Sequence, residues 1–339
     1  MPLHLYIVRR ILFAIPLIIG ITLVAFIIAN AVPSDPVAAN LPEKSLGDPE
    51  IVAAFRREWG LDKSFPEQYL TYLGNMLQGN LGRSIKSKRP VLDDIRQYLP
   101  ATIELATTSI IAGLILGVGM GIVSAVWRGK LVDYVTRVVA LVGVSFPVFV
   151  LALLALSIFH AQLGWAAGPG RLDVRLTKPA YVTGMYLIDS VIAGRSDLLA
   201  NAISHLVLPS LVLGVYSSGL ISRITRSSMI EVLGTEYVRT ARAKGLSERV
   251  VIMKHAFSNA LIPVVTVIGL SFGNLLSGAV LTETIFSWPG IGRYAFQAST
   301  SQDFPAIMGI SMLIAFIYVG VNFVVDILYF FLDPRIRLA

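Results

Sequence analysis

The sequence contains no cysteine, only 14% charged residues and just 4 histidines. Without cysteine, disulfides and thiolate metal sites are excluded. The histidines are scattered, and no His-Glu-x-x-His pair is present, so a zinc hydrolase of that type is excluded as well. A Gly-x4-Gly-Lys-Ser/Thr phosphate loop is also missing, and the chain therefore cannot hydrolyse ATP by that route. An intramembrane hydrolase assembled from distant helices stays as an alternative.

The low fraction of charged residues is matched by a high fraction of apolar ones. They make up 55% of the 339 residues, and the mean hydropathy is +0.72. A bilayer core of about 30 Å needs about 20 mostly apolar residues per helix, and such segments recur along the whole chain. The sequence predicts an all-α polytopic membrane protein. The net charge of +7 does not indicate nucleic acid, because the cations cluster beside apolar runs, as the positive-inside rule predicts.

The first apolar run covers residues 11–32 and follows Arg9 and Arg10. A cleavable signal peptide is an alternative, since Ala29-Asn30-Ala31 offers a small-residue cleavage site. The run is longer than the roughly 7 to 15 residues of a signal core. We therefore predict that residues 1–32 form a cytoplasmic N-terminus and a first transmembrane helix.

Residues 33–100 form a polar segment that we place outside the membrane, where amphipathic helices would lie on its surface or cap a pore. Asp48 and Pro49 indicate a helix start, with an N-cap followed by proline at the first helical position. A second helix is expected to begin at Pro66 and to stop at Gly79. Its apolar positions, which we expect to be buried, are Tyr69, Leu73, Met76 and Leu77.

The second span, residues 101–127, carries glycines at four-residue spacing. Gly113, Gly117 and Gly121 fall on one helix face, an arrangement that allows close helix packing. A phosphate-binding loop would need a preceding strand and a polar opening helix, whereas these glycines stand in continuous apolar sequence. We interpret them as packing residues. A second small-residue face in a later span consists of Ser210, Gly214, Ser218 and Ser222.

Further spans are predicted at residues 138–159, with Pro147 as a kink, and at 206–221, 261–281 and 307–332. Together with the first two spans they give six transmembrane helices with both termini cytoplasmic, five of them in a permease core at 101–339. The short inner loops agree, because they are rich in lysine and arginine. An outer segment at 160–205 is expected to hold short helices near 185–192 and 197–204.

Polar residues within the apolar runs need protein or water around them. Asn322 and Asp326 lie one turn apart near an inner end, within reach of Arg9, Arg10 or Arg137, and we interpret them as packing anchors. A proton-coupled carrier would also use such groups.

Asn274 lies beside Gly273 and Ser277 on a helix that also carries Gly269. Pore lining and helix packing explain this position equally well. Glu104 is a further acidic residue within a predicted span, and it lies near the outer end of its helix.

The stretch from Arg223 to Pro263 is the most charged part of the spanning region. Residues 227–244 are predicted to be helical, Gly245 to end that helix in the left-handed conformation, and Ser247 to cap a second helix. Small residues beside cations allow another protein to approach closely and orient it. A loop that only sets topology would need cations alone. We predict a two-helix connector, residues 223–263, that contacts another protein.

This connector also carries a family resemblance. Tyr237 to Leu246 (YVRTARAKGL), followed by His255 to Pro263 (HAFSNALIP), resembles the cytoplasmic coupling loop of ABC-importer permeases of the dipeptide, oligopeptide and nickel branch. Arg239 stands where the general permease motif has a glutamate, which leaves open which side chain meets the ATPase. Other segments that resemble the branch are Arg9-Arg10, 33–36 (PSDP), 60–63 (GLDK), 79–84 (GNLGRS), 281–293 (LTETIFSWPGIGR) and 333–335 (DPR).

The resemblance implies a type I ABC importer permease fold in a bacterial or archaeal cytoplasmic membrane. It implies a heterodimer with a second homologous permease, two ATPase subunits and an extracytoplasmic binding protein, in contact with lipid and not with nucleic acid. The chain would hold no cofactor and would not be an enzyme, because the partner ATPases would bind ATP and Mg²⁺. The expected cargo is di- or oligopeptides. Nickel complexes, glutathione, opines or oligosaccharides are alternatives, and an ion-coupled secondary transporter is a more distant one.

The resemblance also implies two groups of functional residues. Residues 282–293 would form an outer gate or a contact for the binding protein. The path or gate residues would be Asn274, Ser277, Glu283, Trp288 and Pro289. The ATPase-coupling residues would be Glu236, Arg239, Ala241, Arg242, Ala243, Lys244 and Gly245.

Overall fold

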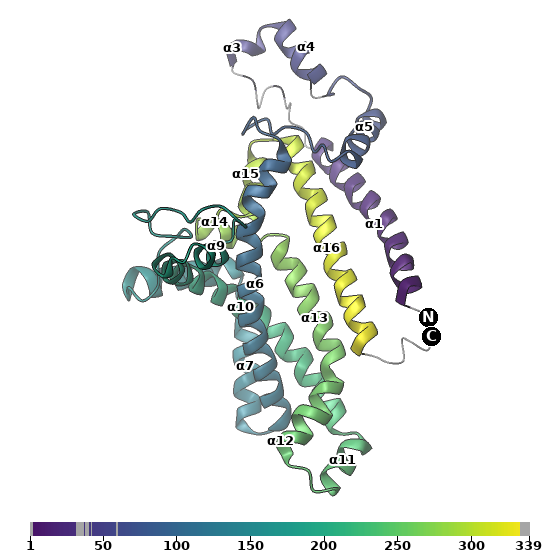
Figure 1. The fold of residues 1–339 in the computed structure, drawn as a ribbon, viewed down its shortest axis with the longest axis vertical. Helices are drawn as coiled ribbons and strands as arrows, with labels where there is room; N and C mark the ends of the chain where they lie inside the picture. The colour runs from purple at the N-terminus through teal and green to yellow at the C-terminus, as the bar shows by residue number, and fades with distance from the viewer. Residues whose placement is uncertain (1–2, 32–36, 38–40, 42, 59, 333–339) are drawn as a thin grey trace.

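A computed structural model describes residues 3–31, 37, 41, 43–58 and 60–332. Within these residues the chain is helical, and the β-structure consists of one isolated bridge between Arg83 and Pro90. The predicted all-α class is confirmed. Long helices run side by side, with short helices at both ends (Figure 1). The motifs predicted at 33–36 and 333–335 lie outside the described residues.

Five helices are long and apolar enough to cross a membrane, or six if one bent pair counts as a span. A continuous helix from Glu248 to Leu276 is built of α12 (Glu248–Val250), the π-helix η2 (Val251–Phe257) and α13 (Ser258–Leu276). It begins well before the predicted 261–281. The other four are α1 (Leu3–Ala31), α6 (Val91–Val126), α10 (Ser196–Leu233) and α16 (Phe304–Leu332).

The bent pair replaces the single span predicted at 138–159. Helix α7 (Leu131–Ser145) is followed by α8 (Val148–Ala155) and the π-helix η1 (Leu156–Gln162), with a bend of 98° between the two halves. Phe146 is extended, at φ −81° and ψ 135°, because the Pro147 ring disfavours the helical conformation of the residue before it. The proline therefore breaks the helix, where the sequence predicted only a kink.

Helix α10 merges two elements that were predicted separately, the short helix near 197–204 and the span at 206–221. It ends at Gly234, so the helix predicted over 227–244 is broken there. Thr235 is extended, at φ −78° and ψ 153°, and its hydroxyl donates to the carbonyl of Val232. A threonine in this position leaves the helix and starts the next one, α11 (Glu236–Ala243).

The short helices gather mainly at the end of the molecule opposite α11 and on one flank (Figure 1). The predicted start of α4 is confirmed, because the Asp48 carboxylate accepts the amide of Glu50 at 3.0 Å. The helix predicted near 185–192 is present as α9. These helices are α3 (Glu43–Leu46), α4 (Pro49–Glu58), α5 (Phe65–Leu77), α9 (Tyr186–Ile192), α14 (Val280–Ile285) and α15 (Ile291–Thr300).

Helix α5 lies close to its predicted position, and Gly79 has the expected positive φ of +75°. Tyr69 and Tyr72 face α1 and α16, where their hydroxyls donate to the carbonyls of Ile19 and Met308, each at 3.0 Å. The predicted burial of Leu77 is wrong, since its side chain is 83% exposed. The contacts of the two tyrosines decide which face turns inward, and Leu77 is on the other face.

Helices α6 and α10 pack in register through their small residues. A Cβ added to Gly117 would lie 2.7 Å from Cβ of Ile221, and one on Gly121 would lie 2.5 Å from Cβ of Thr225. Gly113 faces Gly214 in the same way, with 3.1 Å from such a Cβ to the Gly214 carbonyl oxygen. A side chain at Gly117 or Gly121 would force the helices apart, and one at Gly113 would crowd the Gly214 backbone, so the glycines set the distance between the helices.

Helices α1 and α16 lie side by side (Figure 1) and are joined by an ion pair. Arg10 Nη1 lies 2.8 Å from Asp326 Oδ2, which is one of the pairings that the sequence suggested. Asn322, one turn earlier on α16, is half-buried. The acid within the last span therefore holds the first helix in place.

Candidate functional site

The connector helix α11 lies at one extreme of the molecule, beyond the ends of α10 and α13 (Figure 1). Gly245 follows it with φ +76°, which confirms the predicted left-handed turn, and Ser247 is extended before α12. No heavy atom would lie within 4 Å of a Cβ on Gly245. The turn is therefore open to a partner, and only its backbone conformation demands glycine.

One face of α11 is anchored on the neighbouring helix. Val238 and Ala241 are buried together with Val251 and pack against Val232 and Leu233. Ala241 is only 6% exposed, so its small side chain faces the subunit interior, and its predicted contact with an ATPase stays a prediction. Its size allows α11 to sit close to the start of η2.

The opposite face of the connector is exposed and carries its charges. Arg239 Nη1 lies 2.7 Å from Glu236 Oε1 on the same helix. Arg242 reaches across the Gly245 turn, with Nη2 2.7 Å from Glu248 Oε1 and Nε 3.2 Å from Glu248 Oε2. This pair braces the two arms of the turn. Of the residues predicted to couple to an ATPase, those exposed are Glu236, Arg239, Arg242, Ala243, Lys244 and Gly245.

A buried carboxylate near the connector joins three helices. Asp133 of α7 accepts hydrogen bonds from Ser124 of α6, at 2.6 Å, and from both Nε and Nη2 of Arg226 of α10, at 2.9 Å each. Arg137 Nε lies 3.3 Å away. These bonds tie α6, α7 and α10 together at the end of the molecule where the connector lies.

A second network lies at the other end of the molecule, in the turn between α14 and α15. Glu283 is fully buried and accepts the hydroxyl of Thr102 at 2.8 Å and the amide of Arg293 at 2.9 Å. Thr102 in turn accepts the amide of Ile291 at 2.8 Å. Burial raises the pKa of the Glu283 carboxyl above its usual range, against the opposing effect of these hydrogen bonds.

Trp288 and Arg171 extend this network. The Trp288 indole is 1% exposed and donates to the carbonyl of Ala101 at 2.8 Å. Arg171 places Nη2 2.5 Å from Glu104 Oε2, and its guanidinium lies 3.6 Å from the ring centre of Tyr186 and 5.5 Å from that of Trp288. The outer part of α6 therefore holds both the 282–293 turn and the loop before α9.

The residues predicted to line a path are separated by this arrangement. Glu283 and Trp288 lie inside the subunit, Pro289 and Ser277 are half-buried, and Asn274 is exposed on α13. Leu270 and Pro263 are exposed on the same side of that helix. Glu283 and Trp288 thus position the turn from within, while Asn274 marks a surface that water or a partner must cover.

Several residues of these networks were not singled out in the sequence. Arg171 stands in a loop of mixed charge, and Asp133 sits in a short loop where only cations were expected to matter. Tyr216, exposed on α10 within a span, was also missed. For Tyr216 the sequence did offer a signal, since it is a polar residue inside an apolar run. Arg171 and Asp133 gave no such signal, because their roles depend on partners that are distant in the chain.

Neither a metal site nor a hydrolase site is supported by the described residues. No cluster of three or more histidine and acidic side chains suited to a metal ion occurs within 3–31, 37, 41, 43–58 and 60–332. Gly269-Leu270-Ser271-Phe272-Gly273 has the spacing of a hydrolase nucleophile turn, but it lies in the middle of α13. A nucleophile turn joins a strand to a helix, so this run does not support a hydrolase.

The fold and both networks define a class. Apolar helices long enough to span a bilayer are braced at one end by an exposed connector and at the other by a buried turn. Helices of this length and composition place the chain among multi-pass membrane proteins.

The comparison with protein families is in agreement. Residues 117–338 match the model of the "Binding-protein-dependent transport system inner membrane component", and residues 3–106 match that of its N-terminal region. The chain belongs to this family of binding-protein-dependent transport system inner membrane components. It is therefore a multi-pass membrane permease of an ABC importer that works with a binding protein and with ATPases.

Known relatives match along almost the full length. The chain is 45% identical to the dipeptide transport system permease protein of Alkalihalophilus pseudofirmus, over 98% of this chain and 99% of the relative. It is 43% identical to the probable D,D-dipeptide transport system permease protein of Escherichia coli K12, over 94% and 93%. The glutathione transport system permease protein of E. coli CFT073 is 35% identical over 98% of each chain.

A solved structure shows a similar fold. A chain of the MetNI methionine ABC transporter, in an inward-facing conformation, superimposes with a TM-score of 0.51 at 14% sequence identity. The match covers 70% of this chain and 96% of the other. The helical arrangement is thus that of an ABC importer permease.

Proposed function

We propose that this chain forms half of the translocation path of an ATP-driven importer for di- or oligopeptides. Near full-length identity of 45% and 43% to dipeptide permeases supports this cargo. A glutathione permease at 35% identity keeps that small peptide as an alternative. Nickel complexes, opines and oligosaccharides remain more distant alternatives from the resemblance of the motifs.

The proposed topology has six spans, with the bent pair α7 and α8–η1 counted as one. The start of α1 and the end of α16 point toward the end of the molecule at which the connector lies (Figure 1). We assign this end to the cytoplasm of a bacterial or archaeal cell, because the connector and the short loop at Arg128 and Lys130 are rich in cations. Residues 33–100 and 160–195 would then be outside.

The proposed partners follow from the surfaces that the subunit leaves open. Asn274 and Tyr216 are exposed within spans, which favours a second, homologous permease on the other side of a shared path. Two ATPase subunits would bind ATP and Mg²⁺ and press on α11. The chain itself would then perform no catalysis and hold no cofactor.

The coupling role is supported by the two faces of α11, one of which is buried and the other exposed. Val238 and Ala241 fix one face to η2, and Ala243, Lys244 and Gly245 stand open on the other. A force applied to the open face therefore reaches η2 and α13 directly. At the far end, the turn at 282–293 would transmit the movement to the outer gate through its contacts with α6.

Replacement of Ala243 tests this role. Ala243→Trp adds bulk to the exposed face without disturbing the buried one, so the ATPase can no longer seat against α11. We expect ATP-driven uptake in proteoliposomes to fall by about tenfold or more, a factor within the range that typical coupling free energies produce. Membrane insertion and assembly of the transporter should be unchanged.

The matched control is Ala243→Ser, which keeps the position small. It should retain uptake close to that of the natural chain. Full uptake by Ala243→Trp would show that the open face of α11 is not the ATPase contact.

A further inference from the structure

Helix α5 packs Tyr69 and Tyr72 against α1 and α16 but leaves two leucines exposed. Gln68, Thr71 and Asn75 line a cavity, whereas Leu70 and Leu77 are 66% and 83% exposed. A helix on a water-soluble protein turns its apolar face inward. An interfacial helix instead turns it toward lipid. α5 lies at the end of α1 and α16 (Figure 1), where such an interface is expected.

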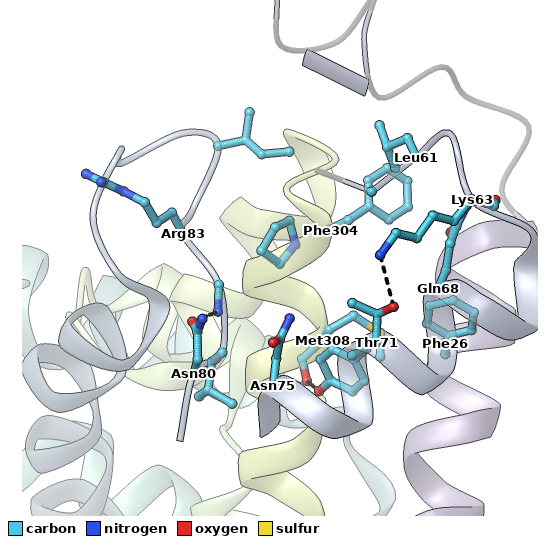
Figure 2. A pocket seen from close by; sticks show the side chains of 16 residues that line it. Phe26, Leu61, Lys63, Gln68, Thr71, Asn75, Asn80, Arg83, Phe304 and Met308 are labelled. Atoms are coloured by element: carbon cyan, nitrogen blue, oxygen red, sulfur yellow. Dashed lines mark hydrogen bonds between the residues drawn. The ribbon is translucent and has the colours of Figure 1, made fainter. Parts of the chain in front are cut away.

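The cavity beside α5 has a volume of about 360 Å³ and opens at this level (Figure 2). It is enclosed by the end of α1, by α5, by residues 80–85 and by the first turns of α16. Its floor is apolar and consists of Phe26, Tyr72, Phe304, Pro305 and Met308. A ligand must therefore combine a polar group with an apolar body.

The charge of the lining is positive. Lys63 and Arg83 are its ionised residues, and no aspartate or glutamate lines the cavity. Figure 2 shows Lys63 reaching toward Thr71, whose hydroxyl oxygen lies 3.3 Å from the Lys63 ammonium. The carboxylate of Glu67 on α5 accepts the amide of Ser64 at 3.1 Å. The Lys63 side chain is exposed, so its ammonium can meet an anion although it also interacts with the Glu67 carboxylate.

Two amide side chains complete the polar wall. Asn75 and Asn80 both line the cavity (Figure 2). The Asn80 carbonyl oxygen accepts the amide of Gly82 at 2.9 Å, which leaves the Asn80 amide nitrogen as a donor toward the cavity. Arg83 donates to the Lys88 carbonyl at 2.8 Å and extends away from the other labelled side chains in Figure 2. Lys63 and the amide groups therefore determine what binds.

We propose that this cavity binds the headgroup of an anionic phospholipid. The phosphate would lie against the Lys63 ammonium, with the headgroup hydroxyls on Asn75 and Asn80. The acyl chains would lie along the exposed apolar residues of α1, such as Leu23, Val24 and Ile27. Lipid is the favoured occupant because α5 turns Leu70 and Leu77 outward at the same level. The assignment to the outer leaflet rests on the topology proposed above.

Lipid retention by the complete transporter tests the site. The transporter is purified in detergent, incubated with phosphatidylglycerol or phosphatidylcholine, and washed, and the bound lipid is counted by native mass spectrometry. Lys63→Gln should lower retained phosphatidylglycerol by about fivefold, as expected for one basic residue at a lipid surface. Lys86→Gln is the matched control, since Lys86 is an exposed cation of the neighbouring loop that does not line the cavity.

A second variant removes a hydrogen-bonding group and keeps the charge. Asn75→Leu should lower retention of phosphatidylglycerol and leave that of phosphatidylcholine unchanged. Equal losses for Lys63→Gln and Lys86→Gln, or equal retention of both lipids by the natural chain, would overturn the proposal. Displacement of the bound lipid by millimolar inorganic phosphate or a short peptide would assign the cavity to a soluble anion instead. Uptake is not the readout, so these outcomes do not bear on the permease assignment.

Discussion

The Glu283 carboxyl group is buried within the turn at 282–293, and its raised pKa makes the stability of the folded protein depend on pH. The folded protein binds this proton more tightly than the unfolded chain does. Its contribution to stability is therefore complete below the usual glutamate pKa and is lost as the pH rises through the raised value. Above that pH the fully buried side chain must carry a charge.

Glu283→Gln removes this dependence, because a neutral amide keeps the shape and does not ionise. The difference in Tm between the variant and the natural transporter should increase in favour of the variant from about pH 4.5 to 8. Thermal unfolding of the purified complex at several pH values measures it. Glu231→Gln, which alters an exposed carboxylate, serves as the control and should show no such trend. If the Tm difference between Glu283→Gln and the natural transporter stays constant or shrinks with rising pH, the pKa of Glu283 is not raised in the folded protein.

At the scale of the elements, the contact between α6 and α10 decides how rigidly the core moves. Gly121→Val would place its Cβ 2.5 Å from that of Thr225, so the helices must separate. We expect a loss of about 1 to 3 kcal/mol in stability, as for other overpacked contacts. Thermal unfolding of the complex and its yield from membranes give the measurement.

Gly119→Val is the matched control on the same helix. A Cβ on Gly119 would meet no heavy atom within 4 Å, and the change adds only a lipid-facing side chain. Stability should stay within about 0.5 kcal/mol of the natural chain. If both variants behave alike, the glycines do not set the distance between the helices.

For the whole molecule, the question is whether the chain can work alone. An ion-coupled carrier would transport by itself in a proton gradient, whereas a subunit that forms half of a path should not. We expect no peptide uptake by the purified chain in liposomes with a proton gradient. Uptake should require the second permease, the ATPases, the binding protein and ATP. Transport by the single chain without ATP would replace the importer with an ion-coupled carrier.

Local rules made much of this molecule predictable. Apolar runs of about 20 residues indicate spans wherever they occur, and glycine after α11, proline between α7 and α8 and the Asp48 cap act on their own neighbours. The motifs of the connector and of residues 281–293 resemble those of one permease branch, and the family match agrees. Composition and local pattern were sufficient for these features because each depends on residues close together in the chain.

The tertiary structure decided which way the side chains of these elements face. Ala241 packs inward because Val251 of the following helix covers it, and Glu283 is held in the interior by Thr102, 181 residues earlier, whose hydroxyl donates to its carboxylate. The face that α5 turns inward likewise depends on other helices, because Tyr69 and Tyr72 bond to carbonyls of α1 and α16. Hydropathy assigns a residue to membrane or water, but burial is a property of contacts between distant segments. For this reason the sequence by itself determined the class and most of the long apolar helices, and only the fold determined the bent pair, the buried networks and the cavity beside α5.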